Sequence, residues 1–88
     1  MVFDEERRGG DEDPVMAAIR RSVAAVMPDV DPGSVTPGRS LAELGCNSVD
    51  RVDVVAMTMD ELGVAVPVPA FAEVRDIGTL AELLRRHL

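Results

Sequence analysis

The chain has 88 residues, and its 16 Asp and Glu against nine Arg and no Lys give a net charge of −7. It has two Phe and no Trp or Tyr, so it lacks the clustered cations and stacking side chains that nucleic-acid binding requires. No apolar run approaches the ~20 residues that span a membrane, and one Cys with one His excludes an internal disulfide and a zinc site. We therefore expect one small cytoplasmic domain that binds no nucleic acid, membrane or metal.

The negative charge is divided between two segments. Residues 1–13 hold six acids and two Arg, a net −4, and have little apolar surface to bury, so we predict a disordered acidic leader there. Residues 14–88 form the predicted folded domain. Within it, residues 48–76 carry another net −4, again from six acids and two Arg. This second concentration of charge needs a functional explanation.

The first predicted helix starts at Pro14, with Asp13 as its N-cap, and ends before Pro28. Its apolar residues recur at helical spacing: Val15, Ile19, Val23 and Val26. Residues 28–47 are then expected to be a long loop without regular structure, because Pro and Gly interrupt them repeatedly. Four apolar side chains are spaced to hold this loop on the core: Val30, Val35, Leu41 and Leu44.

The second predicted helix begins at Ser48, with Asn47 as N-cap and Asp50 completing a capping box, and ends at Gly63. One side of it is apolar and is expected to face the core: Val52, Val55, Met59 and Leu62, flanked by Val54 and Thr58. The other side is acidic, with Met57 among the acids: Asp50, Asp53, Asp60 and Glu61.

The last part of the predicted domain is also helical. Residues 70–74 allow one helical turn, and Asp76 caps a final helix whose Leu80, Leu83 and Leu84 face inward. The prolines within residues 64–69 argue against a strand. The predicted fold class is therefore all-α, with three main helices, one short helix and a long first loop. No large apolar stripe is expected to stay exposed once the helices have packed together, so we expect a monomer.

Residues 44–50, Leu-Gly-Cys-Asn-Ser-Val-Asp, place the hydroxyl of Ser48 in the first turn of a helix, after a glycine turn. The free N–H groups and the positive dipole end at that place favour a phosphate. Ser48 is not expected to be a catalytic nucleophile, because the only His lies in the last turn of the chain and no other general base is near. The simpler alternative is that Ser48 only helps to start the helix.

The order of helix, long Pro/Gly loop, Leu-Gly-x-(Asp/Asn)-Ser-(Leu/Val), acidic helix, short helix and last helix resembles the acyl carrier proteins, over residues 14–88. The resemblance implies a four-helix bundle that is not an enzyme. In it Ser48, beside the capping Asn47, receives phosphopantetheine from coenzyme A through a phosphopantetheinyl transferase, and the thiol of this arm carries acyl groups as thioesters. It also implies that the acidic helix meets basic patches of partner enzymes through Val49, Asp50, Asp53, Ala56, Met57, Asp60 and Glu61.

Three residues depart from the commonest pattern of that family: Asn47 replaces Asp, Val49 replaces Leu, and Arg51 adds a cation to the acidic first turn. Together with residues 66–71 and 76–78, the run 45–51 resembles a narrower group, the free-standing carrier proteins of β-branching cassettes in bacterial polyketide pathways. This resemblance implies malonyl loading by an acyltransferase and decarboxylation to acetyl by a ketosynthase-like enzyme. A hydroxymethylglutaryl-synthase-like enzyme then takes the acetyl group.

Several interpretations stay open from the sequence. The chain is alternatively a carrier for another acyl or aminoacyl group, or an unmodified small helical domain whose acidic face binds a basic partner. Cys46 is interpreted as a small residue at a tolerant turn position rather than as a reactive thiol. Phe71 either plugs the core or contacts partners beside the acidic helix. Arg51 either discriminates between partners or pairs with Asp50 or Asp53 in solvent.

Overall fold

The computed structural model describes residues 13–88, whose regular structure is helical throughout. The helices are α2 (Pro14–Val26), α3 (Ser48–Leu62) and α4 (Ile77–Arg86), with two 3₁₀ helices, η1 (Pro32–Ser34) and η2 (Val68–Glu73). The predicted all-α class with three main helices and one short one is confirmed. The predicted leader, apart from Asp13, lies outside the described residues.

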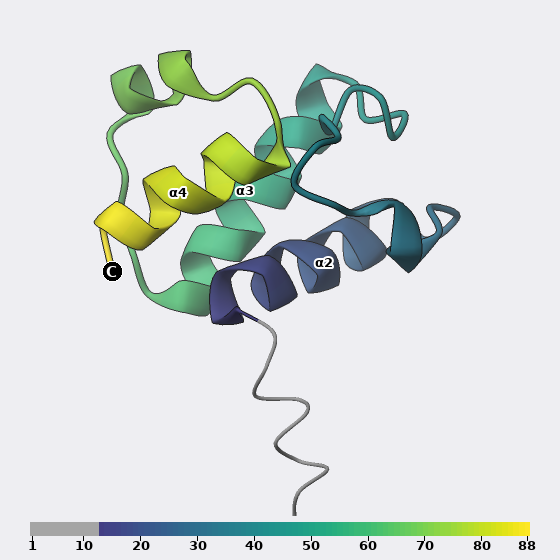
Figure 1. Cartoon of the computed structure of the whole chain (residues 1–88), viewed down its shortest axis with the longest axis horizontal. Helices are drawn as coiled ribbons and strands as arrows, with labels where there is room; N and C mark the ends of the chain where they lie inside the picture. Colours follow the sequence, from purple (N-terminus) through teal and green to yellow (C-terminus); the bar gives the residue numbers. More distant parts are fainter. Residues whose placement is uncertain (1–12) are drawn as a thin grey trace, which may run out of the picture.

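The arrangement is centred on α2, which packs against both α3 and α4, while η2 packs against α4. Figure 1 shows α4 crossing in front of α3, with η2 above it and the long α2–α3 loop on the right. The loop is fixed to the start of α4 by backbone hydrogen bonds, because the N–H of Ile77 donates to Arg39 (2.8 Å) and that of Gly78 to Pro37 (2.9 Å). The beginnings of α3 and α4 are thereby brought to the same end of the molecule.

α2 starts as predicted, since the Asp13 carboxylate accepts a hydrogen bond from the N–H of Val15 (3.0 Å) and Pro14 takes the first helical position. The same carboxylate forms an ion pair with Arg85 near the end of α4. The cap of the first helix is therefore also a link to the last one.

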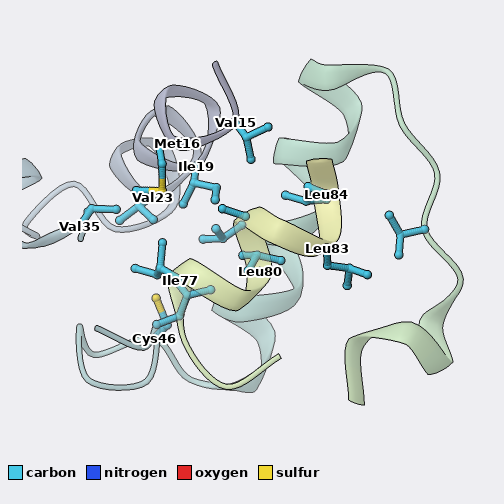
Figure 2. Packing of buried hydrophobic residues seen from close by; sticks show 14 residues of the cluster. Val15, Met16, Ile19, Val23, Val35, Cys46, Ile77, Leu80, Leu83 and Leu84 are labelled. Atoms are coloured by element: carbon cyan, nitrogen blue, oxygen red, sulfur yellow. The ribbon is translucent and has the colours of Figure 1, made fainter. Parts of the chain in front are cut away.

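The core is built from the facing sides of α2 and α4, with contributions from the loop (Figure 2). The predicted inward residues of both helices are buried, except Val26, which is only partly buried: Val15, Ile19, Val23, Leu80, Leu83 and Leu84. From the loop, Val35 and Leu41 are buried in this cluster, and Val30 and Leu44 pack against it, as predicted. The core thus depends on the loop as well as on the helices.

The two 3₁₀ helices correct the sequence prediction in detail. The loop expected to lack regular structure contains η1, which forms because Pro32 suits a first helical position and the Asp31 carboxylate accepts from the N–H of Gly33 (3.1 Å). The helical turn predicted at residues 70–74 is a 3₁₀ helix that starts earlier, at Val68, because Pro69 also fits an N-terminal helical position.

The side of α3 that faces the core differs from the predicted side by a rotation about the helix axis. Val54 and Thr58, expected to flank the apolar side, are fully buried, whereas Val55, Met59 and Leu62 are only partly buried. Val52, expected in the core, is 66% exposed. The reason is a buried polar contact with α2: the hydroxyls of Ser22 and Thr58 are hydrogen-bonded at 2.9 Å, and that of Thr58 also lies 2.7 Å from the Val54 carbonyl. This pair turns the Thr58 side of α3 toward α2.

α4 is capped as predicted. The Asp76 carboxylate accepts from the N–H of Thr79 (2.8 Å), and the Thr79 hydroxyl accepts from the N–H of Asp76 (3.0 Å), so the two residues form a capping box. The hydrogen bonds from Thr79, foremost that of its backbone N–H, lower the pKa of Asp76. The hydrogen bond from Arg85 is the main cause that lowers the pKa of Asp13.

We therefore expect stability to fall in acid. A carboxyl whose pKa is lowered by folding stabilises the folded state above its unfolded pKa of about 3.9, and this stabilisation is lost as the pH falls through the folded pKa. Asp76→Asn keeps a capping oxygen but removes the titration, so its urea midpoint should fall less than that of the wild type between about pH 6 and about pH 3. Val68→Ala, an exposed substitution that changes no titratable group, is the control and should keep the wild-type dependence. An equal fall in Asp76→Asn and wild type would contradict the prediction.

Candidate functional site

Ser48 is the first residue of α3, and its side chain is exposed. The predicted capping box beside it is present: the Asn47 side-chain oxygen accepts from the N–H of Asp50 (2.8 Å), and the Asp50 carboxylate accepts from the N–H of Asn47 (3.1 Å). Gly45 precedes it with φ +99°, a left-handed conformation that side-chain-bearing residues rarely adopt. The turn and the cap together present the Ser48 hydroxyl to solvent at the start of the helix.

Arg51 lies one turn after Ser48, and its guanidinium reaches back to the helix start. Its Nη1 donates to the carbonyl of Cys46 (3.2 Å), and its Nη2 donates to the Oγ of Ser48 (3.4 Å). Within residues 13–88 it forms no ion pair with Asp50 or Asp53, so the interpretation of a solvated arginine paired with those acids is not met. Sequence reasoning missed the contact with Ser48, although the i, i+3 spacing permitted it.

A groove of about 650 Å³ lies between α3 and η2, and Ser48 and Arg51 are among its lining residues. The α3 wall is apolar and includes Val52, Val55 and Met59, which the sequence analysis had assigned to the core. Phe71 of η2 lines the groove and is partly buried against the core, so the core alternative is met in part, and the contact with partners stays a prediction. Other lining residues come from the α2–α3 loop, from the segment between η2 and α4, and from α4 itself: Ser40, Leu41 and Ala42, then Val74, Arg75 and Asp76, and finally Leu80.

A second, smaller cavity of about 420 Å³ lies between η2 and α4. Its lining includes charged side chains such as Glu73, Glu82 and Arg86, and Ser48 is not among its lining residues. Of the two cavities, the groove is therefore the one that belongs to the candidate site.

The predicted recognition residues other than Phe71 lie on α3. Asp53 and Asp60 are exposed, whereas Asp50 is engaged in the capping box and Glu61 forms an ion pair with Arg21 of α2. Two of the four acids are thus already bonded. Ala56 and apolar side chains are exposed between them, with Val49 68% and Met57 42% accessible.

More apolar surface is exposed than the sequence analysis expected. Val52 and Val68, at the two edges of the groove, are 66% and 81% accessible, in addition to Val49 and Met57. The expectation that no apolar stripe is left over is therefore wrong for this side of the molecule. For Val52 the cause is the rotation of α3, which buries Thr58 in its place.

Cys46 is 4% exposed and belongs to the core cluster, at the Ile77 end in Figure 2. Its position is therefore a packed one rather than the tolerant turn expected. Burial raises the pKa of the Cys46 thiol, the charge of Asp50 raises it further, and Arg51 acts in the opposite direction. The thiol is neutral near pH 7 and poorly suited to nucleophilic chemistry.

We expect the Cys46 thiol to react at least about tenfold more slowly with a chromogenic aromatic disulfide in the native protein than in urea, because only an accessible thiolate attacks the reagent. The double variant Cys46→Ala, Ser48→Cys carries an exposed thiol two residues away and is the matched control. It should react at similar rates with and without urea. A native Cys46 that reacts as fast as the control would contradict the assigned burial.

Residues 13–88 contain no group of three or more His, Cys, Asp or Glu that could hold a metal ion. None of the helices in that range is long and apolar enough to cross a membrane. The candidate site therefore consists of Ser48, the cap beside it, Arg51 and the groove.

Comparisons with known proteins agree in pointing to one family. A family model described as the phosphopantetheine attachment site matches residues 17–84. The polyketide biosynthesis acyl-carrier-protein AcpK of Bacillus subtilis (strain 168) is 31% identical over 74 residues, which are 84% of this chain and 90% of the relative. Among solved structures, a chain from the crystal structure of the curacin biosynthetic pathway HMG synthase in complex with acetyl donor-ACP matches with a TM-score of 0.70. It is 28% identical, and the match covers 82% of this chain and 95% of that one.

Proposed function

Because this chain belongs to the acyl carrier proteins, the family with a phosphopantetheine attachment site, we propose that Ser48 is the residue that carries the phosphopantetheine. Proteins of this family carry acyl groups and are not enzymes. The observation that supports Ser48 is its exposed hydroxyl in the first turn of α3, where Ser48 lines the groove and lies within hydrogen-bond distance of Arg51.

The residues around Ser48 fit the group chemically. A phosphodiester on Ser48 Oγ would lie at the N-terminus of a 15-residue helix, where the backbone N–H groups favour an anion. Beyond the phosphate, phosphopantetheine is a flexible arm that ends in a thiol, and when bound it supplies the sulfur that forms acyl thioesters. Asn47 and Asp50 hold the helix start in place, and the groove offers the arm an apolar surface.

We infer further that the acyl group is malonyl or acetyl and that the chain is an acetyl donor in bacterial polyketide β-branching. The similarity to AcpK supports the polyketide setting, and the similarity to the acetyl donor-ACP chain supports a hydroxymethylglutaryl-synthase-like partner. The other inferred partners are a phosphopantetheinyl transferase, an acyltransferase and a decarboxylating ketosynthase-like enzyme. They would meet the α3 surface described above, with Asp53 and Asp60 as the acids that form no ion pair within residues 13–88 and Val49 and Met57 as its apolar contacts.

The location and state of assembly are part of the same proposal. A cytoplasmic monomer suits a carrier that visits several enzymes in turn, and its single cysteine would stay reduced there. Size-exclusion chromatography with light scattering tests the monomer directly. A dimer whose interface covers Val49 and Val52 would contradict it, because that surface is assigned to partners.

The attachment is tested by incubating the protein with coenzyme A and a promiscuous phosphopantetheinyl transferase and measuring its intact mass. We expect a gain of one phosphopantetheine group, and peptide mapping should place it within residues 40–51. No gain under conditions that modify a control carrier would contradict the proposal and favour an unmodified helical interaction domain. Repeating the assay with malonyl, acetyl and aminoacyl donors and their transferases identifies the carried group.

Phe71→Ala is expected to slow acetyl transfer to a hydroxymethylglutaryl-synthase-like enzyme by about tenfold, because it removes apolar contact worth roughly 1.4 kcal/mol beside the groove. The rate of phosphopantetheine attachment should stay at the wild-type level. Leu88→Ala, an exposed apolar residue outside the groove, is the control and should leave both rates unchanged. Equal effects of Phe71→Ala on the two rates would contradict a role in partner selection.

A further inference from the structure

We propose that Arg51 binds the phosphate on Ser48 and so directs the attached arm into the groove. The inference rests on the proposed function and deepens it, because it assigns a positioning role to a cation at a place where this chain departs from the commonest carrier pattern. It starts from one contact: the Nη2 of Arg51 lies 3.4 Å from the oxygen to which the phosphate would be bonded.

The guanidinium is held in this position by the backbone. Its Nη1 donates to the Cys46 carbonyl at 3.2 Å, and Cys46 is itself buried in the core. The two terminal nitrogens of the guanidinium therefore connect the turn before α3 to the side chain of Ser48. An arginine anchored in this way is oriented before any anion arrives, so little side-chain entropy is lost when it binds one.

The charge of Arg51 has no carboxylate partner within residues 13–88. The neighbouring Asp50 uses its carboxylate to accept from the backbone N–H of Asn47. Asp53, the next acid along α3, forms no ion pair with Arg51. A neutral hydroxyl at 3.4 Å is a long contact for a guanidinium, whereas an anionic phosphate oxygen is the kind of acceptor with which arginine forms short, strong hydrogen bonds.

The position of Arg51 also determines the direction in which the attached arm leaves Ser48. Ser48 and Arg51 line the same groove, and the apolar side chains of Val52 and Phe71 follow along its walls. A phosphate drawn toward Arg51 lies on the groove side of the helix start rather than on the opposite, solvent side. The arm beyond it would then leave Ser48 along Val52 and Phe71.

The test uses four proteins in the phosphopantetheine-bearing form, each verified by intact mass after treatment with excess transferase. Arg51→Gln removes the charge at similar side-chain length, and Arg51→Lys restores the charge without the planar fork. Arg75→Gln is the matched control, because Arg75 lines the same groove but forms no hydrogen bond with Ser48 within residues 13–88. The wild type is the fourth protein.

The first measurement is the ³¹P chemical shift of the attached phosphate at ~0.02 M and ~1 M salt, where charge pairs are screened to different extents. We expect a salt-dependent shift in the wild type, in Arg51→Lys and in Arg75→Gln, and loss of that dependence in Arg51→Gln. The second is the nuclear Overhauser contact between arm protons and the Val52 and Phe71 side chains. It should be present in the wild type and in Arg75→Gln and weaker or absent in Arg51→Gln.

The proposal is overturned if Arg51→Gln keeps both the wild-type salt dependence and the contacts to Val52 and Phe71. It is also overturned if Arg75→Gln changes them as much as Arg51→Gln does, since the effect would then belong to the general charge of the groove. Failure of the wild type to gain phosphopantetheine would contradict the attachment itself. The two failures are therefore distinguishable.

Discussion

Ser48→Ala is expected to abolish the mass gain produced by the transferase completely, because alanine has no oxygen on which the phosphodiester can form. The variant should remain folded, since the capping box that starts α3 is made by Asn47 and Asp50 and does not use the Ser48 side chain. Intact-mass measurement after incubation with coenzyme A and the transferase checks the first point. Far-ultraviolet circular dichroism checks the second.

The matched control for Ser48→Ala is Ser40→Ala. Ser40 lines the same groove, and its hydroxyl accepts a hydrogen bond from the N–H of Glu43 (3.1 Å) in the loop. This variant should gain the full mass of one phosphopantetheine. If Ser48→Ala kept the gain and Ser40→Ala lost it, the attachment site would lie on the loop, and the assignment to α3 would be wrong.

Ile19→Ala is expected to lower the free energy of unfolding by about 3 kcal/mol. Ile19 is fully buried on α2 in the cluster that joins this helix to α4, so truncation removes buried apolar carbon atoms and leaves a cavity. A domain of this size has a total stability of about 5–10 kcal/mol, and the loss is therefore a large share of it. Urea unfolding followed by circular dichroism gives the value, because the chain has no Trp or Tyr to serve as a fluorescent probe.

Val68→Ala is the control for Ile19→Ala. Val68 is 81% exposed at the edge of the groove, and its truncation should change the free energy of unfolding by less than about 0.5 kcal/mol. A loss in Ile19→Ala no larger than that of Val68→Ala would contradict the assigned core.

The helix starts could be predicted from the sequence because they depend on neighbours in the chain. Asn47, Asp50 and Asp76 satisfy backbone groups within four positions of themselves, and the structure confirms each cap. The rotation of α3 could not be predicted in the same way. Two overlapping apolar sides of this helix could each face the core. Which of them does so depends on Ser22, which lies 36 positions away in the sequence and is hydrogen-bonded to Thr58.

The candidate site likewise has parts that the local sequence predicts and parts that depend on the tertiary structure. The accessible serine at a helix start follows from the local motif, and the chain indeed belongs to the family that the motif resembles. The groove depends on the separation of α3 from η2, and the Arg51 contact depends on a side-chain conformation, so neither is visible in residue spacing. The spacing of Val52, Val55 and Met59 predicts a core face, which holds in part for Val55 and Met59 but not for Val52, because a groove wall and a core face have the same periodicity.

The link between Asp13 and Arg85 has a practical consequence for handling the protein. It joins the N-cap of α2 to the last turn of α4, whereas Ser48, the first residue of α3, lines the same groove as Asp76, the N-cap of α4. A helix of ten residues is about 15 Å long. A surface tether or a fused reporter joined after Leu88 would consequently sit away from the arm, and the immobilised protein could still be loaded and read by its enzymes.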